Sequence, residues 1–304
     1  MIIVVPGNKL ISIDSITPIL LELFIKYRKR SYIVFFDKKT YTGVLNNTVI
    51  FNALNTCGHI IYIDKKSILS IIKLIYFYFL GFFGSKYIHF GLLDEGIVGL
   101  FWRLHRNNSF YSQKDSYSHN NLYYRNKLRK KDIIIKKPQA KYIIAFNEKM
   151  PELGVINNSK YVYMFGETRT RYEWLNYCKN FGSRNIIKYH QDILNQTAVI
   201  VYILGPFCEV MWLRDKNSYV NLFRDTMDVF KRKFPKIKVL LKPHVTTNLD
   251  IVVNEIGSNK QFEITSMHPS VLSYYASCFV SNLYSTTFAD AYNLGVYTIE
   301  YSDY

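Results

Sequence analysis

Short apolar runs rich in branched side chains recur along the chain and predict buried strands. They cover residues 2–5, 31–36, 57–63, 87–93, 142–146, 161–164, 199–204, 239–241 and 279–280. Apolar residues at helical spacing occupy residues 16–27, 219–234 and 288–294, between these runs. This alternation of strands and helices is typical of an α/β fold built on parallel, doubly wound sheets.

Residues 68–84 form a strongly apolar stretch that Lys73 interrupts. The stretch is shorter than the roughly 18–20 residues that span a bilayer. It contacts either the protein core or a membrane, and we expect a buried helix. Met1 leads into the first apolar run without a preceding basic segment, which favours a first strand over a signal peptide.

The 304 residues, 49% of them hydrophobic and 20% charged, are enough for a globular protein of two domains. The regular pattern lapses at residues 182–196, where polar residues are frequent. We therefore expect a domain of residues 1–190 followed by one of residues 191–304. Four cysteines without close pairing are expected to be small core residues: Cys57, Cys178, Cys208 and Cys278.

The formal net charge of +16 indicates an anionic partner, which is a nucleic acid, a membrane face or a small substrate. Neither a zinc-finger spacing nor an RNA-recognition signature is present, so we do not expect nucleic acid. Basic and aromatic residues concentrate in the stretch 103–141, which begins at Arg103 and ends at Lys141. This stretch is either a solvated basic face or a surface for anionic lipid or an acidic acceptor.

Lys242-Pro243-His244 follows the apolar run 239–241, where proline stops a strand. Ligands of α/β proteins bind at the carboxyl ends of parallel strands. A lysine and a titratable imidazole at this edge suit a phosphate. A second His-Pro pair, His268-Pro269, lies at a loop before a helix, where proline is common, and we expect His268 to be mainly structural.

Two further motifs carry polar chemistry. In Asp94-Glu95-Gly96, after the run 87–93, alternation along a strand lets at most one carboxylate face a cleft, where it could act as a general base. Ser285-Thr286-Thr287 precedes a short helix, and its hydroxyls could bind phosphate together with free backbone amides. Read singly, each motif also fits an ordinary helix cap.

The three motifs, in this order, resemble those of bacterial sialyltransferases and the related transferases of nonulosonic acids and Kdo. Those families carry an acidic-acidic-glycine motif, a Lys-Pro-His-Pro motif and a Ser/Thr motif. Gly205 and Pro206 close the run 199–204 as in the nucleotide-binding half of that family. Val245 replaces the second proline here, which leaves His268-Pro269 as an alternative counterpart.

The resemblance implies a GT-B fold, with two Rossmann-like domains facing across a cleft. The N-terminal domain would bind the acceptor, and the C-terminal domain would bind a CMP-activated sialic acid or related acidic sugar. Transfer to a hydroxyl of a bacterial surface glycan or glycolipid would invert the anomeric centre, without a metal or other cofactor. The enzyme would be cytoplasmic, either free or peripheral on the inner membrane.

The resemblance also implies roles for the residues. Asp94 or Glu95 would be the general base, with Asp94 preferred, and His244 would act on the departing phosphate. The donor would be held by Gly205, Pro206, Lys242, Pro243, Ser285, Thr286 and Thr287.

Three other functions compete with this hypothesis. Transferases of surface polymers that use CMP-Kdo, CDP-glycerol or UDP-sugar donors share the expected fold. A non-catalytic nucleic-acid-binding protein would use the stretch 103–141 and bind with a steep salt dependence. A nucleoside-diphosphate-sugar epimerase ranks low, because no Gly-x-Gly-x-x-Gly loop follows the first strand.

Overall fold

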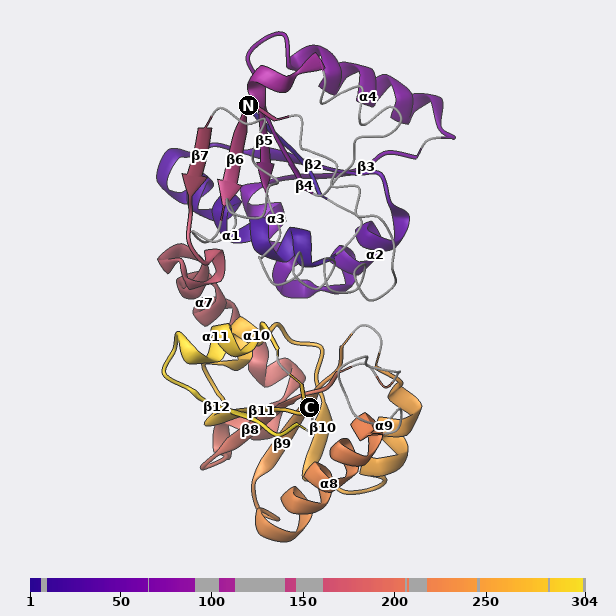
Figure 1. Cartoon of the computed structure of the whole chain (residues 1–304), viewed down its shortest axis with the longest axis vertical. Helices are drawn as coiled ribbons and strands as arrows, with labels where there is room; N and C mark the ends of the chain where they lie inside the picture. Colours follow the sequence, from indigo (N-terminus) through magenta and orange to yellow (C-terminus); the bar gives the residue numbers. More distant parts are fainter. Residues whose placement is uncertain are drawn as a thin grey trace, which may run out of the picture. The chain divides into compact units, whose positions relative to one another are not determined.

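The computed structural model describes residues 1–6, 10–64, 66–90, 104–112, 140–145, 161–205, 207, 218–244, 247–283 and 285–302. These residues form two compact units, Met1–Trp174 (unit 1) and Leu175–Tyr304 (unit 2), each built around its own sheet (Figure 1). The sheets and their helices are described separately for the two units.

The sheet of unit 1 has seven parallel strands in the order β3-β2-β1-β4-β5-β6-β7. The strands are β1 (Ile2–Val5), β2 (Ser31–Phe35), β3 (Gly58–Tyr62), β4 (Lys86–Phe90), β5 (Ser109–Ser112), β6 (Tyr142–Ala145) and β7 (Tyr161–Met164). The order of strand addition reverses between β1 and β4. From β1 the chain adds strands toward one edge of the sheet, and from β4 it adds them toward the other edge. In open α/β sheets this switch point is where ligands bind.

Helices cover both faces of the sheet of unit 1 (Figure 1). One face carries α1 (Leu10–Tyr27), α2 (Lys38–Asn46) and α3 (Thr48–Cys57), and the other carries α4 (Ile68–Leu80). Two short 3-10 helices, η1 (Arg106–Asn108) and η3 (Thr168–Thr170), complete the described elements of this unit. The core under α4 joins Phe77 of that helix to Val5, Val34 and Tyr87 of the sheet.

The sheet of unit 2 has five parallel strands in the order β10-β9-β8-β11-β12. The strands are β8 (Val199–Ile203), β9 (Lys238–Lys242), β10 (Phe262–Ile264), β11 (Cys278–Ser281) and β12 (Tyr297–Glu300). The helices are α7 (Tyr172–Tyr189), η4 (Gln191–Asn195), α8 (Ser218–Lys233), α9 (Leu249–Ile256), α10 (Pro269–Leu272) and α11 (Phe288–Tyr292). Here the strand order reverses between β8 and β11.

The apolar face of α8 builds the core of unit 2. Phe223, Met227 and Phe230 are buried against Tyr202 of β8 and Leu241 of β9. The Tyr202 and Phe223 rings stack, with their centroids 6.0 Å apart. The helical spacing read from the sequence at 219–234 is therefore confirmed, and this packing fixes the position of β9 beside β8.

The structure differs from the sequence-based reading around α7, and the expectation of a buried helix at 68–84 is wrong. The polar segment 182–196 lies in α7 and η4. The helical pattern was missed there because polar residues separate the buried side chains of α7, which are Trp174, Cys178, Phe181 and Ile186. The helix at 68–84 is not buried, since Phe77 is its one buried residue within α4. The contact division at Trp174–Leu175 also falls inside α7, whereas the sequence places the boundary at 190/191. The separate ligand roles of the two domains stay predictions.

Asp37 caps α2 and offers a test of local stability. One of its carboxylate oxygens accepts hydrogen bonds from both the backbone N–H and the hydroxyl of Thr40, each at 2.7 Å. The Thr40 hydroxyl is the main cause of a lowered pKa of Asp37. We expect Asp37→Ala to reduce the free energy of unfolding by about 1 kcal/mol at pH 7, measured by urea denaturation followed by circular dichroism.

Because the pKa of Asp37 is lowered on folding, its stabilising effect is present above the pKa of the unfolded carboxyl. The effect is lost as the pH falls through the lowered value. The difference between wild type and Asp37→Ala should therefore shrink in acid. Asp37→Asn, which keeps an acceptor oxygen, should retain most of the stability at pH 7. Equal losses from the Ala and Asn variants would contradict the capping role.

Candidate functional site

The carboxyl ends of β8 and β9 are tied together by a turn that begins at Lys242. The Leu204 N–H donates to the Lys242 carbonyl at 2.9 Å. The Thr247 hydroxyl accepts from the His244 N–H at 2.8 Å and donates to the Gly205 carbonyl at 2.9 Å. These bonds hold Lys242-Pro243-His244 beside Gly205. The sequence predicted that both would lie at strand ends.

Gly205 itself is held by α8. Its N–H donates to the hydroxyl oxygen of the buried Tyr219. A Cβ at this position would lie 2.8–2.9 Å from the Tyr219 ring, closer than a side-chain carbon tolerates. Glycine is therefore required for the loop after β8 to run against the first turn of α8.

The two ionisable groups of the Lys242 turn have different surroundings. The Lys242 Nζ donates to the Ser266 carbonyl at 3.3 Å, which ties it to the loop after β10. The imidazole of His244 is exposed at the surface of this turn. Desolvation by neighbouring atoms, followed by the charge of Lys242, lowers the pKa of His244 below its ordinary value of 6.5. A neutral ring at pH 7 donates one hydrogen bond rather than a positive charge.

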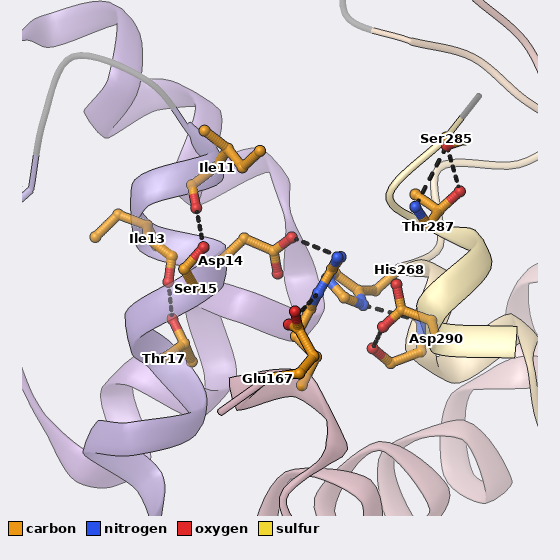
Figure 2. Close-up of polar contacts among 12 residues, drawn as sticks. Ile11, Ile13, Asp14, Ser15, Thr17, Glu167, His268, Ser285, Thr287 and Asp290 are labelled. Carbon is orange, nitrogen blue, oxygen red and sulfur yellow. Dashed lines mark hydrogen bonds and ion pairs between the residues drawn. The ribbon is translucent and has the colours of Figure 1, made fainter. Parts of the chain in front are cut away.

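The second His-Pro pair lies at the neighbouring strand end, after β10. Pro269 occupies the first turn of α10, as the sequence predicts. His268 is buried, and its Nδ1 accepts from the Ser270 N–H at 3.1 Å, which caps α10 (Figure 2). The Ser270 hydroxyl donates to Asp290 Oδ1 of α11 at 2.6 Å, and both residues are buried.

Ser285 and Thr287 form a hydroxyl pair before α11. Their oxygens are 2.7 Å apart, and the Thr287 N–H donates to Ser285 Oγ at 3.3 Å (Figure 2). Thr286 lies between them and is half-buried, as they are. Thr287 is at the cap position of α11 without a capping side-chain bond. Because α11 has five residues, its dipole adds little and the hydroxyls are the main polar feature.

A buried polar network lies at the carboxyl ends of the neighbouring strands β8 and β11. The Ser281 hydroxyl contacts the Ile203 carbonyl at 3.2 Å and so links the two strand ends. The Asn282 amide donates to the Thr226 hydroxyl at 2.9 Å and to the Tyr301 carbonyl at 3.0 Å, and its oxygen accepts from the Tyr202 hydroxyl. Complete hydrogen bonding in a buried network favours a single arrangement.

Four of the predicted motifs thus meet at one edge of the sheet of unit 2, because β10, β9, β8 and β11 are parallel neighbours. They are Gly205, Lys242-Pro243-His244, His268-Pro269 and Ser285-Thr286-Thr287. Sequence reasoning missed Ser270 and Asp290. The spacing Thr287-x-x-Asp290 resembles a capping box, but Asp290 binds Ser270 instead and Thr287 makes no side-chain capping bond.

Other predicted residues lie outside the described part of the chain. They are Asp94, Glu95, Gly96, Pro206 and Val245, together with residues 103 and 113–139 of the basic stretch. In the sequence, Asp94 and Glu95 follow β4, which is one of the two strands at the switch point of unit 1. Three of the four cysteines are described; Cys57 and Cys178 are buried as expected, and Cys278 is partly buried.

Two polar groups near the switch strands of unit 1 were not predicted. His89 of β4 is buried, and desolvation lowers its pKa to about 3, so the ring is neutral. Asp14 of α1 pairs with Arg169, whose Nη1 lies 3.3 Å from Asp14 Oδ2 (Figure 2). Among the residues that the structure describes, no three His, Cys, Asp or Glu side chains are grouped so that they could hold a metal ion.

Comparison with protein-family models and with curated proteins finds no match. Solved structures do match in fold. The UDP-GlcNAc 2-epimerase from Neisseria meningitidis bound to UDP-GlcNAc has a TM-score of 0.60 at 13% identity, over 98% of this chain and 81% of that one. The S. aureus MnaA–UDP co-structure gives 0.58 at 11% identity, over 98% and 78%. The wall teichoic acid polymerase TagF gives 0.51 at 14%, over 99% and 69%.

The chain has the GT-B fold. The fold expected from the sequence is therefore confirmed, with parallel sheets and helices in both units. The identities are low, so the likeness concerns the fold alone. The reported structures are not of sialyltransferases, and membership of that family stays a prediction.

Proposed function

We propose that this protein is a transferase of the glycosyltransferase class that takes a sugar, or a polyol phosphate, from a nucleotide-activated donor and transfers it to a hydroxyl of a bacterial surface glycan. The observation that carries the proposal is the gathering of hydroxyl, imidazole and ammonium groups at the carboxyl edge of the sheet of unit 2. This edge is the ligand-binding edge of open α/β sheets. Hydroxyls and positive groups are the usual partners of phosphate.

Each group has a role that its position supports. The Ser285–Thr287 hydroxyl pair binds the phosphate, and Gly205 holds the end of β8 against Tyr219 beside this edge. The neutral His244 ring donates a hydrogen bond to the departing phosphate oxygen, and Lys242 contributes positive charge nearby. A carboxylate of Asp94 or Glu95 takes the proton of the acceptor hydroxyl. Positioning and charge stabilisation then supply most of the rate, without a metal.

The donor is a pyrimidine nucleotide in this proposal. Two of the fold neighbours are described as bound to UDP or UDP-GlcNAc, and a third polymerises wall teichoic acid. We therefore rank UDP-sugar and CDP-glycerol donors first. A CMP-activated acidic sugar, to which the short motifs point, ranks second. In either case the enzyme would work on the cytoplasmic face of the inner membrane, where surface polymers are assembled from such donors.

A donor screen tests the proposal. Purified protein is incubated with UDP-, CDP- and CMP-activated donors and a mixture of surface-glycan acceptors, and released nucleotide is measured. We expect one donor class to release nucleotide in an acceptor-dependent manner, with chelator having no effect. Failure of every donor class to give acceptor-dependent release would reject the transferase.

An epimerase is the second candidate, because the UDP-GlcNAc 2-epimerase structures match with TM-scores of 0.55–0.60. An epimerase acts without an acceptor. Incubation with UDP-GlcNAc alone, followed by proton NMR of the sugar, separates the two functions. Inversion at C2 in the absence of acceptor would favour the epimerase, whereas an unchanged donor favours the transferase.

A further inference from the structure

Helix α4 exposes a wide apolar face. The side chains of Ile72, Tyr76 and Phe79 are about half exposed, and Ile68 at the start of the helix is 76% exposed. Phe83, in the turn that follows the helix, is 83% exposed. A surface helix of a soluble protein normally carries polar residues on its outer face. Exposed apolar patches of this kind mark interaction sites.

The opposite side of α4 is firmly packed. Phe77 is buried in the core of unit 1, and Leu74 and Tyr78 pack against the same core. The Tyr87 hydroxyl donates to the Phe77 carbonyl at 2.8 Å, which fixes the helix on its face of the sheet (Figure 1). The exposed face is therefore a fixed feature of unit 1, because rotating the helix inward would withdraw Phe77 from the core.

Basic side chains predominate around the apolar face. Among described residues 64 and 66–90, Lys66, Lys73 and Lys86 are exposed, and the one acid is Asp64, whose carboxylate accepts from the Lys66 N–H at 3.0 Å. The whole chain has a formal charge of +16. A second copy of the protein bound face to face would bring like charges together. An anionic lipid surface would instead complement them.

The length of α4 decides how it could meet a bilayer. Thirteen residues at about 1.5 Å each reach roughly 20 Å, short of the 30 Å hydrocarbon core. In the described part of the chain, no helix meets the length and hydropathy of a membrane span. A helix with one apolar face and flanking lysines lies in the plane of the membrane interface instead. Exposed aromatic residues favour the same depth.

We propose that α4 and the turn after it form a docking surface for an anionic phospholipid bilayer. Ile72, Tyr76, Phe79 and Phe83 enter the boundary between headgroups and acyl chains. Lys66 and Lys73 contact the lipid phosphates. The surface lies wholly in unit 1, so the inference does not depend on which donor the enzyme uses.

Vesicle flotation tests the docking surface without any substrate. The full chain is mixed with vesicles of phosphatidylcholine alone or with phosphatidylglycerol added. We expect binding that is strongest to the phosphatidylglycerol vesicles. The double variant Ile72→Gln/Phe79→Gln should reduce the partition coefficient on the order of 100-fold, about tenfold for each side chain. Circular dichroism checks that the variants fold.

Two matched variants sharpen the test. Val253→Gln/Tyr297→Gln, which changes two exposed apolar residues of unit 2, should float as the wild type does. Lys66→Gln/Lys73→Gln should lose about fivefold per lysine on phosphatidylglycerol vesicles and little on phosphatidylcholine.

Three results would overturn the docking surface. The first is a wild-type protein that stays soluble with every vesicle. The second is an Ile72→Gln/Phe79→Gln variant that binds as well as wild type. The third is a dimer seen by analytical ultracentrifugation that this variant dissociates, with no vesicle binding by either protein, which would assign the face to a second copy.

Discussion

Turnover is expected to fall by about 10²–10⁴-fold in Asp94→Asn or in Glu95→Gln, but not in both, because one carboxylate removes the acceptor proton. We expect Asp94→Asn to be the damaging change. In the sequence the pair follows β4, and β4 is one of the two strands at the switch point of the sheet of unit 1, where ligands of α/β proteins bind. Initial rates at saturating donor and acceptor measure the effect.

Nucleotide affinity provides the control for the two carboxylate variants. The groups assigned to the phosphate lie in unit 2, so nucleotide binding should stay close to wild type in both variants. Equal and small losses of turnover would remove the general base from Asp94-Glu95-Gly96. A parallel loss of nucleotide affinity would argue against separate roles for the two units.

Replacing His244 by Ala should lower turnover far more than replacing His268 by Ala, with a loss for His244 on the order of 10²-fold. The exposed ring of His244 can reach a ligand, whereas the ring of His268 is buried and caps α10. His268→Ala should instead reduce the free energy of unfolding by about 1–2 kcal/mol, because the Ser270 N–H loses its acceptor. Steady-state kinetics and urea denaturation measure the two effects.

His268→Asn is the matched variant, since an asparagine oxygen can accept from the Ser270 N–H. It should recover most of the stability that His268→Ala loses. If the ranking is reversed, so that both His268 variants abolish turnover while folding normally and His244→Ala stays active, the His-Pro motif belongs at His268-Pro269.

Nine of the twelve described strands were predicted, because a parallel strand buried on both faces is short and continuously apolar, whereas β5, β10 and β12 were missed. The run at 31–36 matches β2, which is largely buried; the run at 161–164 matches β7, but this strand was expected to be buried and all four of its residues are exposed. Predicting the helices depended on amphipathic spacing. That spacing is clear in α8. In α7 it is interrupted at Gly182, which has no apolar side chain and packs against Tyr275.

The error at α4 has a different cause. A sequence shows that a segment is apolar, but it does not show what covers it. Helices α1, α2 and α3 already occupy the other face of the sheet (Figure 1). Helix α4 meets the sheet through Phe77, Leu74, Tyr78 and Leu80, and the apolar residues on its other side remain exposed.

The candidate site could be predicted in part. The strand ends at Gly205 and at Lys242-Pro243-His244 were recognised because glycine and proline end the apolar runs there. Since neighbouring parallel strands end at one edge of the sheet, the two motifs were expected at that edge. The Ser270–Asp290 bond was not, because it joins two short helices twenty residues apart and depends on tertiary packing.

In this proposal unit 2 binds a pyrimidine nucleotide at the carboxyl edge of its sheet. Isothermal titration calorimetry of the whole protein with CMP, CDP and UDP tests it most directly. The double variant Ser285→Ala/Thr287→Ala is titrated in parallel. We expect saturable binding of at least one nucleotide, weakened at least tenfold in the variant because two hydroxyls leave the phosphate site. No binding of any of the three nucleotides, or equal binding by wild type and a folded variant, would show that this edge is not a nucleotide site.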